Sequence, residues 1–165
     1  MRQPLPLPVD GSQRKYAGAL LPTYERHLSP SSPLLNYTWE RARATLVALA
    51  ADDAGSPHDG IRLEYVNPRT GGPVMPTMDC HIQLLPAGAE TAAHRHSYSV
   101  VYHAVEGTGS TLIGDQRFDW QPGDVFCVPS WAPHQHRNAS SAAPAFLFSY
   151  SDAPVLRAVG LLREG

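Results

Sequence analysis

The sequence has few of the features that mark disulfide-rich, membrane-spanning or nucleic-acid-binding proteins. Its two cysteines, Cys80 and Cys127, lie in apolar runs and form no Cys-x-x-Cys pair, so we predict buried free thiols. No hydrophobic run approaches the length of a membrane-spanning helix, and the amino terminus lacks the apolar core of a signal peptide. We therefore expect a protein of the reducing cytoplasm that does not engage a membrane.

Charge is also scarce. The 13 Lys+Arg and 15 Asp+Glu residues give a formal net charge of -2, and charged residues make up only 17% of the chain. Nothing in this balance attracts nucleic acid or an anionic membrane, so we expect a small-molecule ligand. The 42% of hydrophobic residues and the length of 165 residues are typical of a single globular domain with a substantial core.

Proline and glycine are abundant by contrast, with 16 and 13 residues, which favours many short elements joined by turns. Six of the prolines fall in residues 1–33, where no periodicity is visible, and we predict an irregular proline-rich arm there. Apolar residues then recur at helical spacing over 38–51. Thr38 stands at the cap position and Glu40 in the first turn, so a helix is predicted over this range.

Short strand-like runs separated by turn residues fill the stretch from about 61 to 151. The clearest runs are 61–66, 80–85, 100–105 and 125–128, and they are bounded by turns such as Gly71-Gly72-Pro73. This spacing is typical of an all-β barrel or sandwich, and no helices alternate with the strands. A short helix from about residue 152 is expected to close one end. We predict one domain over 34–165, with the helix 38–51 and a barrel over about 61–151.

Histidines are concentrated in the barrel region, with six of the eight between His81 and His136. His94 and His96 are two residues apart, so in a strand both would project from the same face. His134 and His136 repeat that spacing after a gap that fits two or three strands. Antiparallel pairing would bring His134 opposite the first pair. The pattern predicts a three-histidine metal site, the alternative being surface or hydrogen-bonded core histidines.

The residues around these histidines resemble the two sequence signatures of the cupins. The stretch from Gly88 through the two histidines to Gly107 is similar to the first signature, and residues 123–129 with His134 and Asn138 are similar to the second. The resemblance implies a single cupin, that is a double-stranded β-helix or jelly-roll barrel. It also implies the metal ligands His94, His96 and His134. Many cupins add a glutamate ligand, but no acid lies near Val100, where it would fall.

Five further segments, 63–68, 70–80, 103–107, 129–134 and 154–160, resemble the gentisate 1,2-dioxygenase group, which includes salicylate and 1-hydroxy-2-naphthoate dioxygenases. The resemblance covers residues 34–165 and is to the C-terminal cupin of these enzymes. It implies an Fe(II)-dependent ring-cleavage dioxygenase that takes an aromatic 2-hydroxy acid and dioxygen, in a homodimer or higher homo-oligomer. Zn, Ni or Mn are the other metals that three imidazoles admit.

The same resemblance assigns roles to four more residues. His136, two residues after the third ligand, is the candidate catalytic proton acceptor, the alternative being a residue that fixes the orientation of His134, and Gln83 matches a glutamine of the family. Tyr102 stands where the iron-bearing cupin of the family has an arginine that binds the substrate carboxylate. Gln83 and Tyr102 are expected to orient substrate, and Trp131, which replaces a signature glycine, is expected in the pocket wall. Two alternatives stay open: a non-catalytic metal cupin that binds a small ligand, and a cupin enzyme with another metal.

Overall fold

The computed structural model describes residues 8–16, 20, 21, 23, 24 and 34–165. Its helices are α1 (Gly11–Tyr16), α2 (Trp39–Asp52) and α3 (Ala153–Ala158). Its strands are β1 (Ile61–Glu64), β2 (Asp79–Leu85), β3 (Val100–Glu106), β4 (Gly109–Ile113), β5 (Gln116–Trp120), β6 (Val125–Val128), β7 (His134–Asn138) and β8 (Ala145–Ser151). Most of the arm predicted over 1–33 lies outside the described residues.

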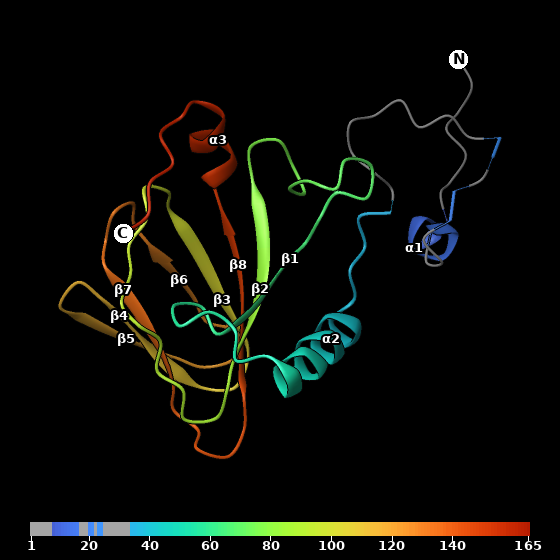
Figure 1. Cartoon of the computed structure of the whole chain (residues 1–165). Helices are drawn as coiled ribbons and strands as arrows, with labels where there is room; N and C mark the ends of the chain where they lie inside the picture. The colour runs from blue at the N-terminus through green and yellow to red at the C-terminus, as the bar shows by residue number, and fades with distance from the viewer. Residues whose placement is uncertain (1–7, 17–19, 22, 25–33) are drawn as a thin grey trace.

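The strands form two antiparallel sheets, one of five strands in the order β1-β2-β8-β3-β6 and one of three in the order β5-β4-β7. Figure 1 shows them as the walls of a barrel, with α3 at one end. This arrangement confirms the prediction of an all-β jelly roll. Four strands, β3 to β6, lie between the two histidine pairs, where two or three were expected. The difference arises because these strands are only four to seven residues long and the turns between them are tight.

Alternate residues of the strands point into the barrel. In β3, Val100, Tyr102 and Ala104 are buried while the residues between them are partly exposed. The apolar core contains these side chains together with Leu85, Tyr98, Trp120, Val128, Ala145, Leu147 and Ala153. Polar side chains are buried as well, namely Asn67, Asp79, Gln83, Thr91, His96, Ser110, Thr111, His134, His136, Asn138, Ser149 and Ser151. Burying so many polar groups is costly unless each has a partner or a function.

Helix α2 covers the outer face of the five-stranded sheet. Its Leu46 is fully buried in a second cluster with Ile61, Ile82, Leu84 and Phe146. The helix begins directly after Thr38, whose backbone is extended as in an N-cap although its side chain makes no capping hydrogen bond. Because α2 packs against the apolar face of β1 and β2, the opposite face of these strands is directed toward the barrel interior. No helix in the described part of the chain is long and apolar enough to cross a membrane.

The two cysteines are free, as predicted, but they are not both buried. Cys80 is half-buried and Cys127 is exposed. Cys127 lies on β6, the edge strand of the five-stranded sheet, opposite Val101. Apolar neighbours in the sequence predicted burial of this thiol wrongly, because α2 packs over β1 and β2 at the opposite side of the sheet and leaves the outer face of β6 open to solvent.

Candidate metal centre and adjoining pocket

Backbone pairing brings the two histidine pairs together. The His94 N–H donates to the carbonyl of His134 at 3.0 Å, and the His134 N–H donates to the carbonyl of His94 at 2.8 Å. This is the antiparallel arrangement expected from the sequence. His94 and His96 lie in isolated bridges on an extended segment, however, and not in a regular strand. His134 is the first residue of β7.

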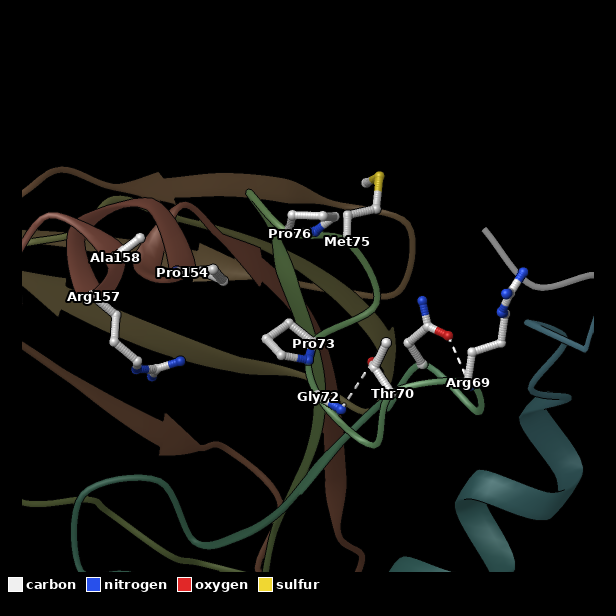
Figure 2. Close-up of a pocket in the computed structure, with 10 residues that line it drawn as sticks. Arg69, Thr70, Gly72, Pro73, Met75, Pro76, Pro154, Arg157 and Ala158 are labelled. Carbon is white, nitrogen blue, oxygen red and sulfur yellow. Dashed lines mark hydrogen bonds between the residues drawn. The ribbon is translucent and has the colours of Figure 1, made fainter. Parts of the chain in front are cut away.

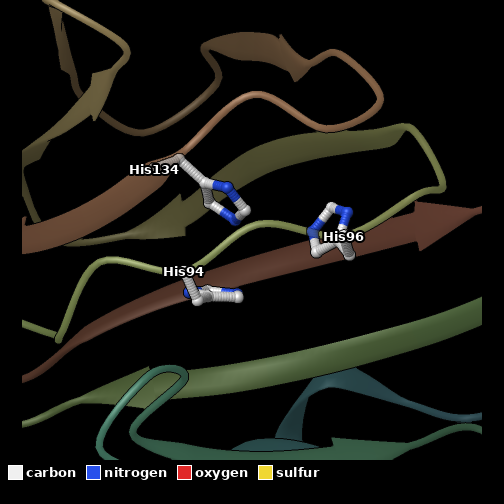
Figure 3. A group of neighbouring side chains, drawn as sticks. All are labelled: His94, His96 and His134. Atoms are coloured by element: carbon white, nitrogen blue, oxygen red, sulfur yellow. The ribbon is translucent and has the colours of Figure 1, made fainter. Parts of the chain in front are cut away.

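The rings of His94, His96 and His134 converge on one point (Figure 3). One ligand nitrogen from each ring can be chosen so that all three lie within 4.8 Å of one another. The ring centroid of His134 is 4.2 Å from that of His94 and 4.8 Å from that of His96. Two of the rings are buried and His94 is half-buried. Three imidazoles on adjoining backbone segments can hold one metal ion and leave further coordination positions open.

The hydrogen bonds of the ring nitrogens fit a metal. Nδ1 of His96 lies 2.8 Å from the carbonyl oxygen of Tyr98, and Nδ1 of His134 lies 3.1 Å from that of Ala132. A proton on Nδ1 in each ring leaves Nε2 with a free lone pair. Nε2 of His134 is buried and has no partner among the described residues.

The rings of the trio are also held neutral. Burial lowers the pKa of His134 to about 4, and it lowers the pKa values of His94 and His96 as well. Metal binding requires neutral imidazole, because a protonated ring has no lone pair to donate. The nitrogen pattern and the low pKa values therefore both suit a divalent cation.

His136 lies beside the trio and is anchored by a polar chain. Its Nδ1 is 2.8 Å from Oγ1 of Thr111, which also accepts a hydrogen bond from the Trp120 indole N–H at 3.0 Å. Its Nε2 is buried and unpartnered within the described structure, and its ring centroid is 5.8 Å from that of His134. Burial holds the pKa of His136 well below its usual value. The residue is a fixed, neutral imidazole with one nitrogen available.

Gln83 and Tyr102 both point into the barrel from neighbouring parts of the large sheet. Both polar atoms of the Gln83 amide are buried without a partner in the described part of the chain. Tyr102 packs edge-on against His136, with ring centroids 4.8 Å apart, and stacks on Phe126 at 5.2 Å. Burial raises the pKa of the Tyr102 hydroxyl well above its usual value, so the phenol stays protonated. The amide of Gln83 thus has unused hydrogen-bonding capacity inside the barrel.

Trp131 lies nearer the surface than expected for a wall of a deep pocket. It is 43% exposed and adopts a left-handed backbone with a φ of 63°. Its ring stacks under the guanidinium of Arg95, whose central carbon is 4.8 Å from the ring centroid. Arg95 is one of the residues that line a pocket beside His94, and Trp131 is not among them. A role for Trp131 in substrate binding remains a prediction.

A pocket of about 390 Å³ opens beside His94. It is lined by Ser56, His58, Asp59, Arg62, His94, Arg95, Tyr98, Glu164 and Gly165. The His58 ring lies 5.1 Å from that of His94, between centroids. Burial raises the pKa of Tyr98 to about 12. The volume suits a ligand of one or two aromatic rings.

Sequence reasoning missed His58, Asp59 and Arg62. A charged residue between two apolar ones in a strand usually faces solvent, and Arg62 follows that pattern between Ile61 and Leu63. A usable signal was the amphipathic helix over 38–51. Because that helix packs against the apolar side of β1, Arg62 has to point into the barrel.

A larger pocket of about 640 Å³ lies between the loop 67–76 and α3 (Figure 2). The loop uses some of its polar groups internally: the Arg69 N–H donates to Oδ1 of Asn67, and the Gly72 N–H donates to Oγ1 of Thr70. Its lining residues include no histidine, cysteine or carboxylate. The smaller pocket, which contains His94, is the one with the means for metal chemistry.

The chain is similar to a known domain family and to several named enzymes. Residues 81–150 match the cupin domain family. The chain is 42% identical over 160 residues to 5-aminosalicylate 1,2-dioxygenase of Comamonas sp. This alignment covers 96% of the present chain and 42% of the relative. It is also 38% identical over 162 residues to gentisate 1,2 dioxygenase 1 of Aquipseudomonas alcaligenes, and that alignment covers 98% of the present chain and 46% of the relative.

A solved structure gives the same picture. The crystal structure of salicylate 1,2-dioxygenase from Pseudoaminobacter salicylatoxidans with gentisate superposes with a TM-score of 0.77 at 32% identity. The match covers 93% of this chain and 43% of that one. The resemblance to cupins and to this dioxygenase group is thereby confirmed. The chain spans less than half the length of these relatives.

Proposed function

We propose that this chain, which contains a cupin domain related to ring-cleaving dioxygenases, is itself a metal-dependent dioxygenase of an aromatic 2-hydroxy acid. The observation that carries the proposal is the trio of neutral, converging imidazoles of His94, His96 and His134 beside an open pocket. The relatives are named for 5-aminosalicylate, gentisate and 1-hydroxy-2-naphthoate. Each of these compounds carries a hydroxyl group next to a carboxylate on an aromatic ring.

The proposed reaction breaks the ring bond between the carbon that bears the carboxylate and the carbon that bears the hydroxyl. Both atoms of dioxygen enter the opened product. The four electrons that reduce dioxygen come from the ring carbons, so no external reductant is required. One substrate and one dioxygen give one ring-opened acid.

We assign the metal to His94, His96 and His134, with Fe(II) as the ion in the working protein. When bound there, Fe(II) would supply Lewis acidity toward the substrate oxygens and the redox activity that a reaction with dioxygen requires. Zn, Ni and Mn suit the same nitrogen ligands. We choose iron because the proposed reaction consumes dioxygen and needs a metal with an accessible redox change, which Zn lacks.

The remaining polar groups of the barrel have distinct tasks in this proposal. Nε2 of His136 accepts the proton of the substrate hydroxyl, since the ring is neutral and its other nitrogen is held by Thr111. The amide of Gln83 forms hydrogen bonds to the substrate, which supplies the partners that the described protein lacks. Tyr102 stays protonated and packs against His136, so it limits how that ring can turn.

The test is the metal content of untagged protein, followed by anaerobic loading with Fe(II) and measurement of oxygen uptake. We expect near-stoichiometric iron and uptake with at least one of gentisate, salicylate, 5-aminosalicylate and 1-hydroxy-2-naphthoate. One dioxygen should disappear for each ring opened. Bound metal without uptake would overturn the dioxygenase proposal in favour of a ligand-binding cupin or another cupin chemistry. No metal after loading would overturn the metal centre.

We also propose that the chain works as a homo-oligomer in the cytoplasm. An apolar groove of about 460 Å³ lies on the outer face of the large sheet, and its lining includes Trp39, Val105 and Phe148. A second copy of the chain packed against this groove would remove its apolar side chains from water. The free thiols of Cys80 and Cys127 suit a reducing compartment. Light scattering after size exclusion would show a monomer if the oligomer proposal is wrong.

A further inference from the structure

Arg62 is a charged side chain directed into the barrel. It lies on β1 between Ile61 and Leu63, which pack in the cluster beneath α2. Its strand partner is Gln83, the interior residue of β2 with an unpartnered amide. Only 21% of the Arg62 side chain is exposed, and it lines the same pocket as His94. A guanidinium therefore stands on the wall of the pocket that the metal trio adjoins.

Asp59 holds this guanidinium without using all of its donors. Nη1 of Arg62 donates to Oδ1 of Asp59 at 3.0 Å. The Arg62 Nε–H is buried and has no partner in the described part of the chain. A guanidinium offers five N–H donors in a plane, and two of them on one edge match the two oxygens of a carboxylate. A buried donor without an acceptor is costly, and a bound carboxylate would remove that cost.

The other candidates for binding an anion are less suited. Arg95 also lines the pocket, but it is exposed and stacks on Trp131. Tyr102 carries no charge, because burial raises the pKa of its hydroxyl. Arg62 is the more buried of the two pocket-lining arginines, and an ion pair is stronger where water is excluded.

We infer that Arg62 binds the carboxylate of the substrate, with Asp59 as the positioning residue that keeps its guanidinium in the pocket. The inference rests on the proposed function, because it assumes that the ligand is an aromatic acid whose ring lies between Arg62 and His94. It makes the pocket selective for acids over neutral phenols of the same shape. Specificity for the carboxylate then comes from β1, whereas the metal ligands come from segment 94–96 and β7.

The test compares salicylate with salicylamide, in which a neutral amide replaces the carboxylate. Both are titrated by calorimetry into the Fe(II)-loaded full chain under nitrogen. Arg62→Gln should weaken salicylate binding by about 10- to 100-fold and change salicylamide binding by less than about twofold. Arg62→Lys should restore part of the salicylate affinity, since it keeps the charge but not the planar donor pair.

Arg117→Gln is the matched control, because Arg117 lies on β5 and is exposed, and the substitution removes the same charge. This variant should bind both compounds like the parent. The inference is wrong if Arg62→Gln binds salicylate as tightly as the parent, if it loses both compounds equally, or if Arg95→Gln shows the selective loss instead. Metal content and circular dichroism of each variant report whether the site and the fold have survived.

The two proposals can fail separately. Loss of salicylate selectivity in Arg62→Gln together with no oxygen uptake by the parent would support the role of Arg62 and overturn the dioxygenase proposal. Oxygen uptake by the parent with unchanged salicylate affinity in Arg62→Gln would support the dioxygenase proposal and overturn the role of Arg62. In an active protein, Arg62→Gln should raise KM for the acid far more than it lowers kcat.

Discussion

His94 and His134 face each other across a pair of reciprocal backbone hydrogen bonds, with their ring centroids 4.2 Å apart. The bonds join main-chain atoms, so they do not depend on either imidazole. The distance between the two rings is set by the barrel, and a metal would enter a site whose ligands already lie close together. Replacing one imidazole should therefore remove a ligand and leave the bridge intact.

We predict that His94→Ala and His134→Ala each abolish stoichiometric metal binding, because two imidazoles do not hold a divalent ion tightly at this kind of site. The cost in free energy of unfolding should be small, about 1–2 kcal/mol. His103→Ala is the control, since His103 lies on the groove outside the barrel. Elemental analysis and urea unfolding provide the two measurements. Stoichiometric metal in His134→Ala would show that the ion binds elsewhere.

Gln83 offers a test of function against stability. Its amide is fully buried and unpartnered among the described residues, so Gln83→Leu should raise the free energy of unfolding by about 1–2 kcal/mol. The same substitution should weaken binding of salicylate. Asn138→Leu is the contrasting variant, because the Asn138 amide donates to the carbonyls of Leu85, Pro86 and Ala143. It should destabilise the fold by about 3 kcal/mol. Destabilisation by Gln83→Leu would mean that the amide has partners in the free protein.

His81 predicts part of the acid sensitivity of the fold. Burial lowers its pKa to about 4, from about 6.5 in the unfolded chain, although Asp79 lies 3.9 Å from its Nδ1. Between pH 6.5 and 4 the unfolded chain binds a proton that the folded chain does not, so stability falls as the pH is lowered through this window. When the pH is lowered from 7 to 5, the free energy of unfolding should fall by roughly 2 kcal/mol less in His81→Gln than in the parent. Urea unfolding at both pH values measures this, and equal losses in parent and variant would contradict it.

Substitutions at two turn glycines distinguish the stability cost of backbone strain from the cost of steric overlap. Gly107 and Gly114 both have positive φ, 84° and 61°. A Cβ on Gly107 would lie 2.8 Å from Ala145, whereas nothing lies within 4 Å of one on Gly114. Gly114→Ala should cost about 1 kcal/mol for the left-handed backbone, and Gly107→Ala about 1–3 kcal/mol more for the overlap. Equal melting temperatures for the two variants would show that Ala145 moves aside freely.

The sequence predicts those parts of the molecule that depend on local pattern. The two-residue spacing of the histidines and the expectation of antiparallel pairing were enough to predict that His94 lies close to His134. The short runs between turns were enough to predict an all-β barrel or sandwich, and the resemblance to the cupin signatures narrowed this to a jelly roll. These features need only the two-residue period of a strand and the positions of glycine and proline.

Other features depend on tertiary structure and were missed for that reason. The inward direction of Arg62 follows from which face of β1 is covered by α2, and the exposure of Cys127 follows from its place on an edge strand. Neither of these is encoded in the few residues on either side.

Segment 94–96 is bound to its surroundings by main-chain hydrogen bonds on both sides. Besides the bonds with His134, Arg95 exchanges backbone hydrogen bonds with Gly165, and the Trp131 N–H donates to the carbonyl of His96. The ligand-bearing segment is thus held without help from an ion, unlike a zinc finger, which unfolds when its metal is removed. We expect that a chelator strips the protein reversibly, so that a single folded preparation can be reconstituted in turn with iron, manganese, nickel or zinc.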